Sequence, residues 1–547
     1  MLHRCPLSSS RETITLQAIL ETTCPCSSPQ LVNLNGRQYH AANESVRAMP
    51  KRKAAVRWTG ATTLDRSPRT GTEGRVSKIS QTGPDGDVLP LVGLYFRLID
   101  QKPHSLFHEP SFRASIAAGT ASRTVLICMM AMCARFSTQP DVRARGPMYI
   151  AEAKAALKGD IENICVENLQ ACILVGNICA GDCDSNAESL YFALATRMAH
   201  ILKVWDMNDG DDGVTREIKR RIWWTCFIID TWGSGGIGLS RQFGWRPKMP
   251  NVPMDEAVFS AMRPGDPDID SLEWKPGLWG HMVRLVEIYG QIQDFLRHLA
   301  ESDDWDENAI SDTVRDLDTQ MTDFELNIGP DLAFSTHNLS RYLSHGLGSV
   351  FIAFHLGFHH YKTLLFYIYL DSRRSSVRNG KAYARRCKHH ATTVCEVLKA
   401  SRDHPGAEAL YNIVGHVTIV SSSVLLHTYL FGEADELPHS RRCLESNLET
   451  LVQLRGYWAN IDLMIKRLVI FQNNCMRSLN EDTYRFDRWM VKFLIAHSLT
   501  LEDKNEHVTF SIPAYAVGQS DGGNMHLERG RVTQGIIMGI RGLDGLE

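Results

Sequence analysis

The sequence predicts an all-α protein, a large helical array between two segments of low order. Three observations predict this class. Apolar residues repeat about every 3.6 residues between residues 87 and 500, which is the period of an α-helix. Alternating strand patterns with Asn-Gly or Asp-Gly hairpin turns are absent from that region, which argues against a sandwich, a barrel and a βαβ sheet. The 547 residues are 44% hydrophobic and 22% charged, as in globular proteins, so a large core is available.

Residues 1–86 are predicted to be a disordered, basic segment. They are rich in Ser, Thr, Gly, Pro and Arg, and too few apolar residues repeat at a helix or strand period to offset the entropy of ordering. Between residues 45 and 80, nine basic residues against two acids give a local charge of +7, although the net charge of the chain is −3. Within it, Lys51, Arg52 and Lys53 are expected to drive import into the nucleus; the alternative is a solvated tail.

The helical period begins near residue 87. Residues 121–136 and 282–299 carry apolar side chains at helical spacing, and so do residues 187–205. We therefore expect residues 87–500 to form the helical domain. In 187–205 the predicted apolar stripe is Leu190, Leu194, Met198, Ile201, Leu202 and Trp205.

The two most apolar stretches, residues 347–370 and 409–432, are not expected to span a membrane. Both contain several histidines, and one also contains a lysine, which a lone helix in lipid would not bury cheaply. The sequence therefore predicts an intracellular protein without a membrane partner. After residue 500, glycine and polar residues return, so residues 501–547 are predicted to be a loose C-terminal tail.

Two short motifs resemble ligand-binding loops but lack the necessary context. Gly233, Gly235 and Gly238 fit the G-x-G-x-x-G pattern, yet a Pro- and Gly-rich segment follows where a dinucleotide fold opens a helix, so we predict a flexible exit from a helix. Residues 206–217 have the length of an EF-hand loop, but the glycine needed at the sixth position is missing. This loop is interpreted as a solvated turn before a helix capped by Thr215.

The fourteen cysteines are predicted to be reduced thiols, because they lack the density of a small disulfide scaffold. Several Cys and His residues are close in sequence, but two close cysteine pairs and the H-E-x-x-H glutamate are missing, so core packing is favoured over metal binding. These sets are His355 with His359; Cys387, His389, His390 and Cys395; and Cys172, Cys179 and Cys183.

An ordered series of blocks between residues 88 and 480 resembles a known family. Leu94-Tyr95-Phe96 resembles its opening, residues 169–174 its second block, and residues 354–359 a later helix. The most informative block, residues 187–256, contains Arg197, Glu217, Arg220, Arg221, Trp223, Trp224 and Asp230. Together these blocks are similar to the fungal-specific transcription factor domain, the regulatory middle region of fungal zinc binuclear cluster transcription factors. The resemblance implies a structural role for these seven residues.

The resemblance implies a nuclear regulator of genes transcribed by RNA polymerase II, not an enzyme, whose helical domain is a regulatory, effector-sensing module. The implied partners are DNA, through a zinc cluster that is missing or supplied by a partner, the transcription machinery, a small-molecule effector, and a second copy or a related chain in a dimer. The alternative is an interaction or dimerisation module without DNA binding that modulates a full-length factor.

The sequence departs from the family pattern in its cysteines. The resemblance implies six N-terminal cysteines, in two C-x2-C-x6-C groups, that hold two zinc ions and place a helix in the major groove. The cysteines before Cys128 are Cys5, Cys24 and Cys26, so no zinc cofactor is expected in this chain. Two explanations stay open: the gene model lost its first exons, or the protein regulates without reading DNA itself.

Two charge interactions are predicted within the family block. Glu217 and Arg221 are four residues apart on one helix face and are interpreted as a surface ion pair. Asp230 ends an apolar run, so if it is buried it needs a cation, for which Arg197 or Arg220 would serve. A structural ion pair is favoured here over a ligand or regulatory cavity among the helices.

Overall fold

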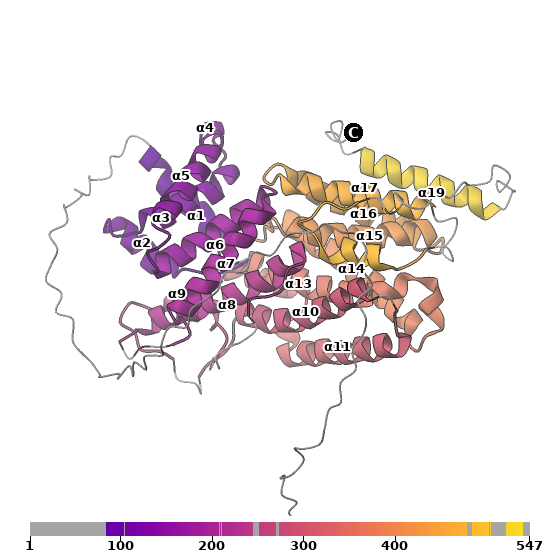
Figure 1. The fold of residues 1–547 in the computed structure, drawn as a ribbon, viewed down its shortest axis with the longest axis horizontal. Coiled ribbons are helices and arrows are strands. Elements are labelled where there is room, and N and C mark those ends of the chain that lie inside the picture. The colour runs from indigo at the N-terminus through magenta and orange to yellow at the C-terminus, as the bar shows by residue number, and fades with distance from the viewer. Residues whose placement is uncertain are drawn as a thin grey trace, which may run out of the picture. The chain divides into compact units, whose positions relative to one another are not determined.

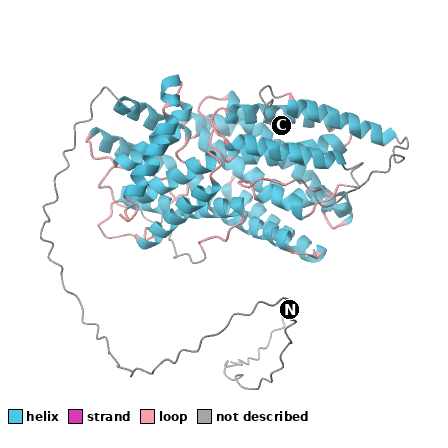
Figure 2. Cartoon of the chain, turned by 45° about the horizontal axis from the view of Figure 1, so that its top comes forward, coloured by secondary structure: helices cyan, strands magenta, loops and turns pink. Residues whose placement is uncertain are grey.

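The secondary structure of the described residues is helical, without a β-strand (Figure 2). This finding confirms the predicted all-α class. The computed structural model describes residues 84–102, 104–206, 208, 210–243, 251–269, 273–302, 304–477, 484–502, 504 and 521–539. The basic cluster from Lys51 to Lys53 and the cysteines Cys5, Cys24 and Cys26 lie outside these residues. Their predicted roles stay predictions.

Among the described residues up to 261, the first part of the array contains nine α-helices, several of which are labelled in Figure 1. They are α1 (Val88–Leu98), α2 (Glu109–Ala117), α3 (Arg123–Cys133), α4 (Pro140–Ala144), α5 (Gly146–Gly159), α6 (Val166–Gly181), α7 (Ser185–Ile201), α8 (Gly213–Ile237) and α9 (Glu256–Ala261). α3 packs on α1, α5 and α6, and α7 packs between α6 and α8. The 3-10 helices Pro84–Asp87 and Ala134–Phe136 belong to this part.

From residue 278 onward, the part of the chain that the structure describes contains ten α-helices, which form the second part of the array. They are α10 (Leu278–Glu301), α11 (Glu307–Ile328), α12 (Thr336–Ser344), α13 (Gly348–Phe366), α14 (Gly380–Asp403), α15 (Val414–Phe431), α16 (Leu437–Arg455), α17 (Asn460–Arg477), α18 (Arg488–Ile495) and α19 (Asp521–Met538). Three 3-10 helices, Pro330–Leu332, Tyr367–Leu370 and Ser372–Ser376, lie between them. α13 packs on α10 and α14, α15 packs on α14, α16 and α17, and the contact of α8 with α10 joins the two parts (Figure 1).

α13 and α15 form the centre of the second part. Every residue of α13 is buried, and α15 is buried from Val414 to Leu430. Among the described helices, α15 alone is long and apolar enough to cross a membrane by length and composition, and 94% of it is buried within the array. A core helix of a helical protein has the same composition, because all of its sides face neighbouring helices.

The face that α7 buries matches the predicted stripe only in part. Met198 is buried, and Leu194, Leu202 and Trp205 pack against the core. Leu190 and Ile201, assigned to the apolar stripe, are 58% and 56% exposed. The side chains that α7 buries are Glu188, Tyr191, Phe192, Ala195, Thr196, Met198 and Ala199. The prediction was wrong for Leu190 and Ile201, because two interleaved sets of apolar residues share this helix and α6 and α8 cover the set with the aromatic rings.

α8 begins and ends differently from the prediction. Its N-cap is Asp212, whose carboxylate accepts the Thr215 backbone N–H at 2.8 Å, so Thr215 is not the cap. The helix continues through the glycine-rich stretch and ends at Gly238, which has a φ of +69°. Gly235 lies within the helix, where an added Cβ would overlap the buried Gln293 of α10. The G-x-G-x-x-G glycines therefore belong to a helix and its end, and Gly235 permits close helix packing.

The segment after residue 500, predicted as a loose tail, contains one helix among its described residues. α19 packs on α15 and α17. Arg529 donates hydrogen bonds to the carbonyl oxygens of Leu430 and Gly432, and Gln472 donates one to Thr533 at 3.1 Å. The sequence prediction did not include this helix.

Candidate functional site

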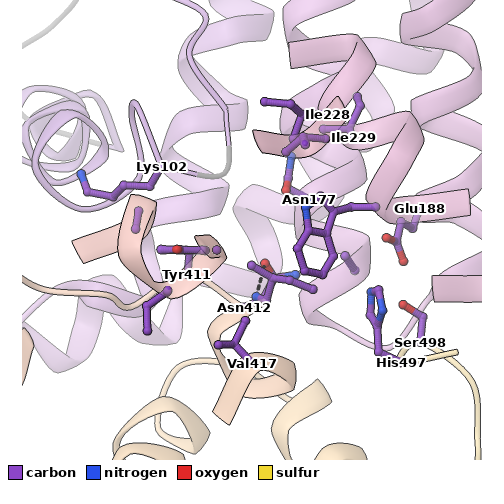
Figure 3. Close-up of a pocket in the computed structure, with 18 of the residues that line it drawn as sticks. Lys102, Asn177, Glu188, Ile228, Ile229, Tyr411, Asn412, Val417, His497 and Ser498 are labelled. Atoms are coloured by element: carbon purple, nitrogen blue, oxygen red, sulfur yellow. Dashed lines mark hydrogen bonds between the residues drawn. The ribbon is translucent and has the colours of Figure 1, made fainter. Parts of the chain in front are cut away.

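A cavity of about 110 Å³ lies where seven helices meet: α6, α7, α8, α10, α13, α15 and α17. Figure 3 shows side chains that line it. The segments around residues 411–413 and 497–498 complete its wall. Much of the wall is apolar and is formed by Phe192, Ile228, Ile229, Val286, Leu356 and Tyr361. Because these helices lie far apart in the sequence, the cavity depends on the tertiary fold.

Glu188 of α7 is the acidic side chain that lines this cavity among the described residues. It is 5% exposed, and its Oε2 atom has no hydrogen-bond partner in the described part of the chain. Burial raises the pKa of Glu188 to about 8. The neighbouring position on α8 is Gly233, where an added Cβ would lie 4.0 Å from Oε1 of Glu188. The absent side chain at Gly233 leaves room beside the carboxyl group.

Aromatic rings stack on one side of the cavity. The indole N–H of Trp232 donates a hydrogen bond to the Tyr361 hydroxyl at 3.1 Å. The ring of Tyr361 stacks on Tyr289 with a centroid separation of 4.1 Å. Trp232 also stacks on His360, and His497 meets its edge. This packing holds the indole of Trp232 in a fixed orientation in the cavity wall.

Lys102 lines the cavity on the opposite side from Glu188 in Figure 3. Its ammonium group donates hydrogen bonds to the carbonyl oxygens of Arg97, at 2.9 Å, and Asp100, at 3.1 Å. Burial lowers the pKa of Lys102 to about 8. The cation is therefore held by main-chain oxygens, and among the described residues it forms no ion pair with Glu188.

The Glu217 cluster, which consists of Glu217, Arg220 and Arg221, is buried. The interpretation of Glu217 and Arg221 as a surface pair was wrong, because both side chains have 0% exposure. The Arg221 Nε atom donates to Glu217 at 2.8 Å, and Arg220 forms a second ion pair with the same carboxylate. The Met254 N–H donates to Glu217 at 3.0 Å, and Arg221 donates to the Met254 carbonyl at 2.8 Å. The cluster therefore fastens the segment before α9 to α8.

Asp230 is buried, but neither Arg197 nor Arg220 pairs with it, so that expectation was wrong. Its carboxylate accepts the backbone N–H groups of Gln242, at 2.8 Å, and Phe243, at 2.9 Å. Arg197 is exposed, and Arg220 is held by the Glu217 cluster. Burial raises the pKa of Asp230, while these backbone hydrogen bonds lower it. Backbone donors replace the expected cation and tie the chain after α8 back to the helix.

Trp223 and Trp224 are buried on α8. Trp223 packs edge to face against His200 and Trp205. The indole N–H of Trp224 donates to the Asn251 carbonyl at 3.3 Å. Like the Glu217 cluster, both tryptophans connect α8 to other segments. Neither lines the cavity that Glu188 and Lys102 line, which we call the central cavity.

The candidate metal ligands do not converge on a cation site among the described residues. His355 and His359 have ring centroids 6.0 Å apart, and the Nδ1 atoms of His359 and His390 share a hydrogen bond at 3.0 Å. His389 and Cys183 are exposed, and the other sequence candidates, Cys172, Cys179, Cys387 and Cys395, are buried. In the EF-hand-like loop, Glu217 points into its own cluster and provides no loop ligand.

Sequence reasoning missed Glu188, Trp232, Tyr361 and His497. A signal for Glu188 existed, because it lies three residues before Tyr191 and seven before Ala195, on the face that α7 buries. An acidic residue in an apolar stripe marks a buried polar site. We find no equivalent sequence signal for Trp232, Tyr361 or His497, since aromatic side chains are common in cores.

Comparison with known proteins gives a family match. Residues 92–323 match the model of the fungal specific transcription factor domain. The Zn(2)-C6 fungal-type transcription factor FTF1c of Fusarium oxysporum f. sp. lycopersici is 21% identical over 446 residues, covering 72% of this chain and 47% of that protein. FTF2 of the same fungus is 20% identical over 73% of this chain and 40% of its own length.

A third relative is a transcriptional regulatory protein of Schizosaccharomyces pombe. It is 22% identical over 317 residues, which cover 50% of this chain and 32% of that protein. The chain thus spans less than half the length of each of these three relatives. No solved structure matches the chain.

Proposed function

Residues 92–323 carry a fungal specific transcription factor domain, and from this premise we propose that the chain is a nuclear regulator of transcription by RNA polymerase II. The observation that carries the proposal is the family match, together with relatives that align with up to 73% of the chain and are named as transcription factors. The helical domain acts as a regulatory module, and it acts by binding and not by catalysis.

The central cavity supports the effector-sensing part of this proposal. It lies between helices of both parts of the array, so a molecule bound there touches α6, α7 and α8 as well as α10, α13 and α15. A ligand that binds one arrangement of these helices better than another shifts the population toward that arrangement. The same domain then presents a different surface to the transcription machinery or to a second chain.

The experiment is a reporter assay with the full chain fused to a heterologous DNA-binding domain. We expect transcription of the reporter to change several-fold relative to the DNA-binding domain alone. The control fusion carries Ile222→Asp, which places a charge at a fully buried position of α8 and should abolish the effect through misfolding. A folded native fusion that occupies the promoter without altering transcription would contradict the proposal.

A second candidate function is a dimerisation module that modulates a full-length factor without binding DNA. The observation in its favour is that the cysteines before Cys128 are Cys5, Cys24 and Cys26, which do not form two C-x2-C-x6-C groups. A mobility-shift assay with promoter and scrambled DNA at about 150 mM salt separates the two functions, because phosphate contacts alone weaken steeply with salt. The second function predicts no sequence-specific complex with DNA that contains this chain, and the first predicts such a complex when the cluster-bearing partner is added.

A further inference from the structure

We propose that the central cavity binds a small primary alkylammonium ion, with the ammonium group against the Glu188 carboxylate. This inference deepens the proposed function by naming the chemical class of the effector. The inference rests on the proposed function in one respect, because the bound molecule is an effector only if the chain regulates transcription. Whether the cavity binds the ion is a separate property that can be measured on the purified chain.

The size of the cavity limits the ligand. Its volume is about 110 Å³. An engineered apolar cavity of about 150 Å³ in another protein admits benzene. The cavity therefore accepts an alkyl chain of about four or five carbon atoms and excludes larger ring systems.

The cavity contains buried hydrogen-bond acceptors that have no partner. These atoms are Oε2 of Glu188, Oδ1 of Asn460 and Nδ1 of His497, each unpaired among the described residues. All three side chains are less than 8% exposed. Burial lowers the pKa of His497 to about 4, so its ring is neutral and one tautomer presents Nδ1 as an acceptor. An ammonium group carries three N–H donors and is suited to such a set.

Three other polar side chains of the wall form hydrogen bonds within the protein. Lys102 donates to two main-chain carbonyl oxygens, and the Asn177 amide donates to the Ile173 carbonyl at 2.9 Å. Asn412 accepts the backbone N–H of Ile413 at 3.0 Å (Figure 3). The Lys102 ammonium is therefore turned toward main-chain oxygens and lies on the side of the cavity opposite Glu188 (Figure 3). An anionic ligand placed beside Glu188 would meet a like charge there.

Glu188 and His497 lie against the same side of α8. An added Cβ at Gly233 would lie 4.0 Å from Glu188, and one at Gly236, a turn further along the helix, would lie 2.7 Å from the His497 ring. The rings of Phe192 and Trp232 line the same cavity. Aromatic faces attract a cation in a site shielded from water, so they add to the preference for an ammonium group. The aliphatic part of the ligand then lies against Ile228, Val286 and Leu356.

The test is isothermal titration of the full chain at about pH 9 with n-butylammonium chloride, 1-butanol and sodium butyrate. Burial raises the pKa of Glu188 to about 8, so at this pH the group is a carboxylate while the alkylammonium ion keeps its charge. We expect n-butylammonium to bind and the two others to bind at least tenfold more weakly. 1-Butanol has a similar shape but no charge, and butyrate carries the opposite charge. Equal affinity for 1-butanol, or no binding of n-butylammonium by the folded chain, overturns the proposal.

Three variants locate the binding site. Glu188→Gln has the shape of the protonated acid and should fold, yet it should reduce affinity for n-butylammonium at least tenfold. Val417→Ile adds a methyl group to the cavity wall and should also weaken binding. The matched control is Glu167→Gln, an exposed glutamate in the first turn of α6, which should leave affinity unchanged.

Unchanged affinity in Glu188→Gln would show that the ligand binds elsewhere and would overturn the proposal. This failure is distinguishable from a failure of the proposed function. The reporter assay depends on the regulatory activity of the fused chain and needs no amine. The titration depends only on the cavity.

Discussion

Glu217, Arg220 and Arg221 show how three charged residues can be buried on one helix. The guanidinium of Arg221 lies over the ring of Phe259 at 4.4 Å, and that of Arg220 lies over Trp274 at 4.3 Å. A planar guanidinium can stack on a ring and donate hydrogen bonds at its edge at the same time. The carboxylate of Glu217 accepts from both arginines and from a backbone N–H, so the charge is compensated.

Removal of the Glu217 charge should strongly destabilise the fold. We expect Glu217→Gln to lower the free energy of unfolding by about 3 kcal/mol, because it leaves the buried Arg221 without a carboxylate and Arg220 with Asp268 alone. Urea unfolding of the full chain measures the change. Asp312→Asn is the control, since this exposed side chain pairs with the exposed Arg315 and should cost less than about 1 kcal/mol. Similar losses for the two variants would argue against a structural role of the Glu217 cluster.

Glu188 should make stability depend on pH. Its pKa rises from the ordinary 4.5 to about 8 on folding, so between these values the folded state binds a proton that the unfolded state has released. Stability is therefore lost as pH rises from 4.5 to 8, by up to about 3 kcal/mol at pH 7. Glu188→Gln should remove this loss, and melting curves at several pH values check it. Parallel pH profiles for the native chain and the variant would refute the prediction.

At the scale of the elements, the sequence predicted which segments are helical better than which faces they bury. Leu190 and Ile201 have the spacing of a buried stripe, but they are exposed, since the neighbouring helices cover the side that carries Tyr191 and Phe192. In α13 every face is buried, so periodicity cannot assign an inner side. The sequence prediction missed Glu188 because it assigned the wrong buried side to part of α7. Glu188 lies on the side of α7 that meets α8.

Close contact between elements should make Gly181 intolerant of a side chain. Gly181 ends α6, where an added Cβ would overlap the ring of Trp458. That ring is 2% exposed, and its N–H donates to the Leu410 carbonyl at 2.6 Å, so it has little freedom to move. We expect Gly181→Ala to lower the free energy of unfolding by about 2 kcal/mol.

The control for Gly181 is Gly93→Ala in α1. No atom lies within 4 Å of a Cβ added at Gly93, so alanine should stabilise this helix by about 0.5 to 1 kcal/mol. Urea unfolding of both variants gives the comparison. A stabilising effect of Gly181→Ala would contradict the packing of α6 on Trp458.

At the scale of the whole molecule, the all-α class and the family could be predicted from local patterns and block order. The match over residues 92–323 confirms the family resemblance. The cavity could not be predicted, because its wall combines helices from α6 to α17. Nor could the backbone partners of Glu217 and Asp230, since Met254, Gln242 and Phe243 reach them through loops whose course no period encodes.

Nuclear import is predicted to depend on Lys51, Arg52 and Lys53. Replacement of all three by alanine removes the densest part of a segment with a charge of +7 and should abolish nuclear accumulation of a fluorescent fusion. A triple alanine variant at Arg66, Arg69 and Arg75 is the matched control, because it removes the same charge from dispersed positions. Nuclear accumulation that is unchanged in the first variant would remove the import prediction.

The central claim is that the chain regulates transcription. Rapid depletion of the full-length protein in its host, followed at once by sequencing of nascent transcripts, tests this claim most directly. Both a DNA-bound factor and a module that modulates another factor should alter the synthesis of a discrete set of RNA polymerase II transcripts before other changes develop. Nascent transcription that is unchanged after complete depletion would contradict the claim.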